Sequence, residues 1–165
     1  MPDAAEASND RAAFRGGSTL NPADALAVQS LVTAYFQRTD RPGTGEVADL
    51  FTSDGVLILG NLEIVGRTAI ATFFADRNRD QADAKRLTRH LTGGVDLCPA
   101  PPDRIIGYST TAVFAGLGDL PLAVALPSSI ADFDDVFVHT ATGWLFEKRH
   151  ATVIFTGPGA ASFTR

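Results

Sequence analysis

The chain has 165 residues, of which 45% are hydrophobic and 20% are charged, the proportions of one globular domain with an apolar core. The net charge of −5 argues against a nucleic-acid-binding protein, which carries a basic surface, and no apolar run approaches the ~20 residues of a membrane-spanning helix. Cys98 is the single cysteine, which excludes an internal disulfide and a multi-cysteine metal site. Because the N-terminus lacks a basic stretch followed by an apolar segment, we expect a soluble cytoplasmic protein.

The two ends of the chain are predicted to be tails. Residues 1–20 carry few large apolar side chains and no periodicity, so they bury too little surface to offset the entropy of ordering. We therefore expect a flexible N-terminal tail over 1–20, one domain over 21–158 and a short C-terminal tail over 159–165.

Three helices are predicted in the first half of the chain. Asn21-Pro22 is typical of a helix start, and Pro42-Gly43 ends that helix. Apolar residues between these points recur at three- and four-residue spacing, which indicates one buried face. A second, short helix is expected over 44–51, and a third opens at Thr68 and fades in the polar stretch 77–85.

Strands are predicted from residue 56 onward. The first strand, 56–59, ends in a hairpin turn at Gly60-Asn61. Helices at the front followed by antiparallel strands predict an α+β fold, in which the helices lie on one face of a curved sheet. Such a half-closed cone has an interior that can hold a ligand. The later strands are expected over 87–98, 104–115, 129–139 and 144–156.

An apolar connection, 116–127, joins two of these strands. Its leucines and valine are suited either to a flap over the mouth of the cone or to a dimer surface, and the sequence leaves both open.

Five short patterns, in this order, resemble the SnoaL-like members of the NTF2-like superfamily, which include polyketide cyclases, scytalone dehydratase and ketosteroid isomerase. The resemblance spans roughly residues 24–156. It implies a cone of three N-terminal helices packed on a strongly curved, mainly antiparallel sheet, and a homodimer without a cofactor. The patterns are Tyr35-Phe-Gln-Arg-Thr-Asp40, Leu50-Phe-Thr-Ser-Asp-Gly-Val56, Gly66-Arg-Thr-Ala-Ile70, Thr88-Arg-His-Leu-Thr-Gly93 and Asp135-Val-Phe-Val with Gly143-Trp-Leu-Phe146.

The resemblance points to Asp40, His90 and Tyr35 as catalytic residues. Dehydratase and dehydrochlorinase members of the superfamily place an Asp at the end of the first helix and a His on the strand after the third, and one dehydratase has a Tyr five residues before its Asp. A neutral imidazole can remove a proton while a carboxylate on its other nitrogen fixes the tautomer. A phenol can polarise a carbonyl or protonate a leaving hydroxyl.

Side-chain geometry adds two expectations about these residues. Alternation along a strand places Thr88, His90 and Thr92 on one face, polar enough to line a wet pocket. Five residues turn ~140° around an ideal helix, so Tyr35 and Asp40 converge only if the helix loosens before Asp40.

Substrate contacts are assigned to five further residues, and no metal site is expected because three His without a close pair and one Cys are a poor ligand set. A carboxyl aimed into an apolar cone, one expectation for Asp135, has a raised pKa and can serve as a second acid. The alternative for Asp135 is a solvated edge or an arginine partner. The alternatives are packing for Trp144 and the dimer surface for His150. The five residues are Asp135, Phe137, Phe74, Trp144 and His150.

Three functions are compatible with the sequence. The first is a cofactor-independent lyase, isomerase or cyclase that acts on a small hydrophobic oxygenated molecule of polyketide, steroid or terpenoid type through His and Asp. The second is a non-catalytic small-ligand-binding protein. The third is an assembly partner like the β subunit of a ring-hydroxylating dioxygenase. An Asp40 carboxylate within hydrogen-bond reach of a His90 ring nitrogen, both beside a cavity, favours the first.

Overall fold

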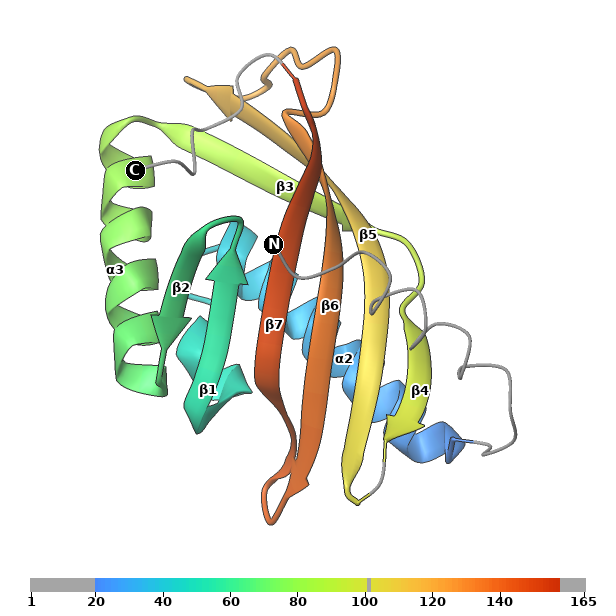
Figure 1. The fold of residues 1–165 in the computed structure, drawn as a ribbon. Helices are drawn as coiled ribbons and strands as arrows, with labels where there is room; N and C mark the ends of the chain where they lie inside the picture. The colour runs from blue at the N-terminus through green and yellow to red at the C-terminus, as the bar shows by residue number, and fades with distance from the viewer. Residues whose placement is uncertain (1–19, 101, 158–165) are drawn as a thin grey trace.

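A computed structural model describes residues 20–100 and 102–157 (Figure 1). The two predicted tails, except Leu20, lie outside the described residues. The described chain runs as helix, short helix, hairpin, helix and then five strands, the α+β order that the sequence predicts.

The two helices start close to where the sequence predicts them. Helix α2, Pro22–Asp40, starts after Asn21, whose Oδ1 accepts a hydrogen bond from the amide of Ala23 at 2.9 Å. Helix α3, Arg67–Asp83, buries Ile70 and Phe74 and extends through the polar stretch in which the sequence pattern fades.

The second predicted helix is only a four-residue 3-10 turn, η1, Val47–Leu50. Within the described residues, the three predicted N-terminal helices are instead two α-helices and this turn. Gly43 and Gly45, with φ of 93° and 135°, hold the preceding chain outside helical geometry, and the strand begins directly after η1. Its apolar side chains still enter the core, as expected.

Seven strands form one mixed sheet in the order β2-β1-β7-β6-β5-β3, with β4 also paired to β5. Strands β1 and β7 are parallel and all other pairs are antiparallel. The strands are β1 Phe51–Leu59, β2 Leu62–Val65, β3 Arg86–Thr92, β4 Asp96–Ala100, β5 Arg104–Leu117, β6 Ser129–Thr140 and β7 Gly143–Thr156.

The single strand predicted over 87–98 is two strands. Gly93 and Gly94 separate β3 from β4, and the two strands pair with opposite halves of β5. Because of this break, β3 crosses the C-terminal end of α2, and residues of β3 lie beside Asp40.

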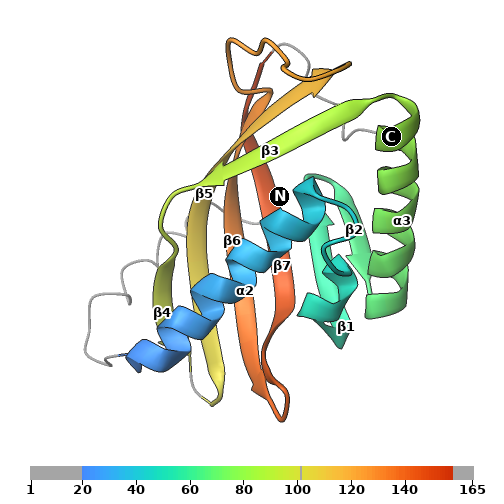
Figure 2. The ribbon, with the colours of Figure 1, turned by 180° about the vertical axis from the view of Figure 1, so that it is seen from behind.

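The helices cover one face of the sheet. In Figure 2 α2 crosses diagonally over this face while α3 stands beside β2. In Figure 1 no described helix lies on the opposite face of β5, β6 and β7, here called the uncovered face. The core lies between α2 and the covered face, where aromatic rings from both meet, such as Phe36 and Phe133 with centroids 5.5 Å apart. Among the described residues, no helix has the length and apolarity needed to cross a bilayer.

Candidate active site

Asp40 and His90 meet where the end of α2 lies against β3. The Nδ1 of His90 lies 2.6 Å from Oδ1 of Asp40, and the amide of His90 donates to Oδ2 at 2.7 Å. The hydroxyl of Thr88 donates to Oδ1 at 2.8 Å. The expected contact is therefore present, and three donors from β3 hold one carboxylate.

The surroundings of this pair favour an ionised carboxylate. The side chain of Asp40 is 6% exposed and that of His90 is 13% exposed. Burial alone would raise the pKa of Asp40, but the hydrogen bonds from His90 and Thr88 outweigh it and hold the pKa below its usual value. Because an ionised carboxylate only accepts hydrogen bonds, Nδ1 of His90 carries the proton. The ring of Phe36 stacks on the imidazole, with centroids 5.1 Å apart and planes at 24°, and fixes its orientation.

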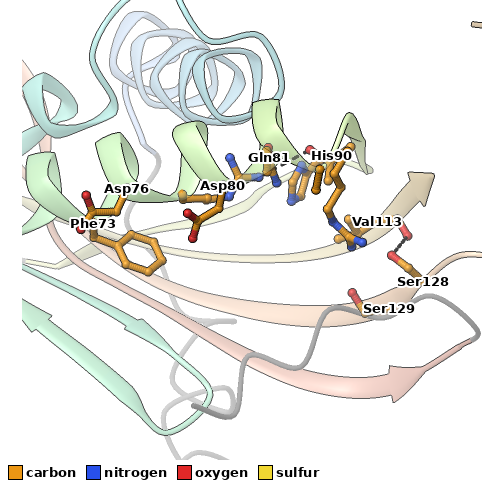
Figure 3. A pocket seen from close by; sticks show the side chains of 12 residues that line it. Phe73, Asp76, Asp80, Gln81, His90, Val113, Ser128 and Ser129 are labelled. Carbon is orange, nitrogen blue, oxygen red and sulfur yellow. Dashed lines mark hydrogen bonds between the residues drawn. The ribbon is translucent and has the colours of Figure 1, made fainter. Parts of the chain in front are cut away.

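His90 lines two cavities inside the cone. The outer one, about 470 Å³, lies between α3 and the sheet, with Gln81 of α3 on one side and Val113 and Ser129 on the other (Figure 3). The inner one, about 70 Å³, is lined by five aromatic rings from α2, α3 and β6 together with aliphatic and small residues of the sheet. Nε2 of His90 makes no hydrogen bond with any residue that the structure describes. The alternation predicted for Thr88, His90 and Thr92 holds, since all three face the covered side.

Tyr35 lines the inner cavity but does not join Asp40. Helix α2 stays regular through Asp40, so the loosening needed for the two side chains to converge does not occur. The phenol is buried, and burial raises its pKa, so it remains protonated. Tyr35 therefore lines the inner cavity as a protonated phenol, separate from the Asp40–His90 pair.

Asp135, predicted to contact substrate, instead forms a fully buried ion pair with Arg149, with Oδ2 and Nη1 2.9 Å apart. Burial outweighs the opposing charge of Arg149 and raises the pKa of Asp135 to about 7, the direction expected for a carboxyl in an apolar cone. The guanidinium carbon of Arg149 lies 4.2 Å from the ring centroid of Tyr35 and 4.3 Å from that of Phe133. Neither partner of the pair is among the residues that line the cavities of His90.

A bulge explains why Arg149, and not His150, faces the core. Pairing of β6 with β7 shifts between Val136 and Phe137, so Glu147 is an extra residue and the alternation reverses beyond it. His150 therefore lies opposite exposed Asp134 on the uncovered face, away from both cavities. The assignment of His150 as a substrate contact is corrected for this reason.

The remaining predicted contacts divide between core and cavity. Phe74 lines the inner cavity, whereas Phe137 is fully buried in the core. Trp144 is corrected too: its Nε1 donates to Asp24 at 3.0 Å, and it lines a separate hollow at the other end of α2 with His139. It packs the first turn of α2 instead of touching the site.

Arg77 is a cavity residue that the sequence reasoning missed. It lies on α3 and lines both cavities, one turn beyond Phe73 and Phe74. Because residues three and four apart share one face of a helix, the spacing of Arg77 from these two rings could have indicated that Arg77 faces the same cavity. Within the described part of the chain, no group of three or more His, Cys, Asp or Glu side chains is placed to hold a metal ion.

Comparison with known proteins identifies relatives of this cone. The model of the SnoaL-like domain family matches residues 22–150. ActVI-ORFA from Streptomyces coelicolor is similar in structure, with TM-score 0.67 and 24% identity over 81% of this chain and 96% of that chain. A scytalone dehydratase-like protein from Novosphingobium aromaticivorans has TM-score 0.67 and 17% identity over 82% and 87%. An NTF2-like protein with a cystatin-like fold from the same organism has TM-score 0.67 and 17% identity over 97% and 96%. No curated protein matches the sequence.

Proposed function

We propose that this protein, which belongs to the SnoaL-like domain family, removes a proton from the carbon beside a carbonyl group of a small, largely apolar oxygenated molecule. Elimination, isomerisation or ring closure then follows from the same carbanion-like state. The observation that carries the proposal is the 2.6 Å contact between Asp40 and His90, with the second ring nitrogen free beside a cavity.

His90 is the base in this proposal. With the proton on Nδ1 held by the Asp40 carboxylate, Nε2 presents its lone pair and can take a proton from the substrate. The imidazolium that forms is stabilised by the adjacent negative charge, and the contact with Asp40 keeps the ring from rotating. Asp40 is thus a positioning residue that acts through His90.

The inner cavity supports an apolar substrate with an oxygen function. Rings of Phe36, Phe74 and Phe133 line it, and its volume of about 70 Å³ accommodates part of an apolar skeleton whose remainder lies in the outer cavity of about 470 Å³. Tyr35 is the proton donor to a carbonyl or leaving hydroxyl, since its phenol lines the same cavity as His90. The likeness to ActVI-ORFA and to a scytalone dehydratase-like protein favours substrates of the polyketide type.

A minimal substrate tests the proposal. In 3-hydroxy-1-tetralone, removal of a C2 proton by Nε2 breaks the C3–O bond, and hydroxide leaves as water after taking a proton. The enone that remains tautomerises to fluorescent 1-naphthol, so the net change is the loss of one water. We expect the purified protein to form 1-naphthol and His90→Ala to lower the rate about 100-fold or more.

A matched variant separates chemistry from folding. His150→Ala removes the same group from the uncovered face of the sheet, and we expect it to retain the rate of the unmodified protein. Equal rates for His90→Ala and the unmodified protein would contradict the proposal. Binding of the tetralone without conversion would instead support the non-catalytic ligand-binding alternative.

A further inference from the structure

Arg77 carries a positive charge that no carboxylate within the described residues neutralises by direct contact. Its Nη1 donates to the carbonyl of Thr39 at 3.0 Å and to Oδ1 of Asn78 at 3.4 Å. Its Nη2 lies 3.5 Å from the hydroxyl of Thr88. All three acceptors are neutral oxygens, so the guanidinium is held in place but its charge is left without an ion-pair partner in this part of the chain.

The position of Arg77 makes this charge costly. The side chain lines both cavities beside His90, and burial lowers its pKa. Buried arginines are usually paired with an anion, because removal of a charge from water is unfavourable. Asp40 attracts Arg77 from a distance, but its two oxygens are already bound by His90 and Thr88.

The other charges of the outer cavity do not neutralise this site. Arg86 lines the same cavity, and its positive charge lowers the pKa of Arg77, so Arg86 is not a counter-charge for Arg77. Asp76 and Asp80 also line the outer cavity, but Asp76 forms an ion pair with Arg79, Asp80 is exposed, and neither is hydrogen-bonded to Arg77. Next to His90, the carboxylate of Asp40 is engaged by His90 and Thr88, whereas the guanidinium of Arg77 has no direct ion pair with a described residue.

We infer that Arg77 binds a carboxylate group of the substrate, so that the substrate is an apolar ring compound that carries an acid. This rests on the proposed function, because it assigns a class to the molecule that reaches His90. A guanidinium matches a carboxylate with two parallel hydrogen bonds. The outer cavity, about 470 Å³, has room for the rings of such a molecule, which would contact the aromatic side chains where the two cavities meet while its carboxylate lies at Arg77.

A pair of probes of equal shape tests this inference without any turnover. 2-Naphthoate and 2-naphthamide differ in charge but hardly in size, and their dissociation constants are measured by fluorescence titration at pH 7.5. We expect naphthoate to bind about tenfold or more tightly than naphthamide, and Arg77→Gln to abolish this preference. Arg79→Gln is the matched control, since it removes the same charge from the exposed side of α3 and should leave the preference intact.

Equal affinities of the two probes for the unmodified protein would overturn the inference. So would a preference that survives Arg77→Gln, or one that Arg79→Gln reduces equally. His90→Ala should keep the preference, so failure of the catalytic proposal and failure of this inference are distinguishable.

A second measurement covers the case in which Arg77→Gln does not fold, since Arg77 also ties α3 to the last turn of α2. In the unmodified protein, the Nε–Hε resonance of Arg77 should shift on addition of 2-naphthoate and not of 2-naphthamide. Absence of a shift with naphthoate would overturn the inference.

Discussion

Asp40 holds His90 through both of its oxygens, so a change of this one carboxylate affects the base directly. In Asp40→Asn the amide no longer specifies which ring nitrogen carries the proton, and the imidazolium loses its counter-charge. We expect kcat for 1-naphthol formation to fall about 100-fold or more. Asp134→Asn, on the uncovered face, is the control and should retain activity. A fall of less than about threefold in Asp40→Asn would contradict the role of Asp40.

The same carboxylate predicts a dependence of stability on pH. Because the pKa of Asp40 in the folded protein lies below its unfolded value of 3.8, its contribution to stability is complete above that value. The contribution is lost as the pH falls through the lower folded pKa. Urea unfolding at pH 6 and at successively lower pH should therefore show a difference between the unmodified protein and Asp40→Asn that shrinks on acidification. A difference that grows would contradict the direction of the pKa shift.

At the scale of elements, the pairing of β6 with β7 brings the Asp135–Arg149 ion pair into the core. Removal of one partner leaves a buried charge without compensation, which costs about 3–5 kcal/mol of unfolding free energy. We expect this loss for Asp135→Ala at pH 8, where the carboxyl of the unmodified protein, with its pKa of about 7, is mostly ionised. The double variant Asp135→Leu with Arg149→Met should recover most of it, since apolar pairs of similar volume replace such ion pairs without loss. Chemical denaturation measures both.

The elements also show which features the sequence makes predictable. Helix α2 was predictable because a capping Asn21 and a closing Pro42 bound one apolar face. The orientation of His90 toward the covered face of the sheet was also predictable, because side chains alternate regularly along β3. The inward turn of Arg149 did not, because a bulge at Glu147 reverses the alternation and no residue type marks its position.

Two further differences have local causes. Residues 87–98 have strand propensity throughout, and only the Gly93-Gly94 pair signals that the strand divides. Arg77 belongs to a helix that is polar beyond its second turn, so its burial depends on where β3 crosses, which is a tertiary contact. Asp40 and His90, fifty residues apart, are brought together by that same crossing.

At the scale of the whole molecule, the cone separates two ends with different chemistry. One end holds the Asp40–His90 pair and the two cavities, and at the other Trp144 is hydrogen-bonded to Asp24. The end of β5 and the connection to β6 expose Leu117, Leu120 and Leu126, which belong to the apolar segment 116–127 predicted to be a flap or a dimer surface.

The central claim is that His90 removes a carbon-bound proton, and solvent exchange measures this step without any leaving group. In D2O, 1-tetralone can exchange its two C2 hydrogens for deuterium through proton abstraction alone, and the loss of their NMR signal gives the rate. We predict that the unmodified protein accelerates this exchange and that His90→Gln lowers the acceleration about 100-fold, while His150→Gln does not. Exchange at an unchanged rate in His90→Gln would contradict the account.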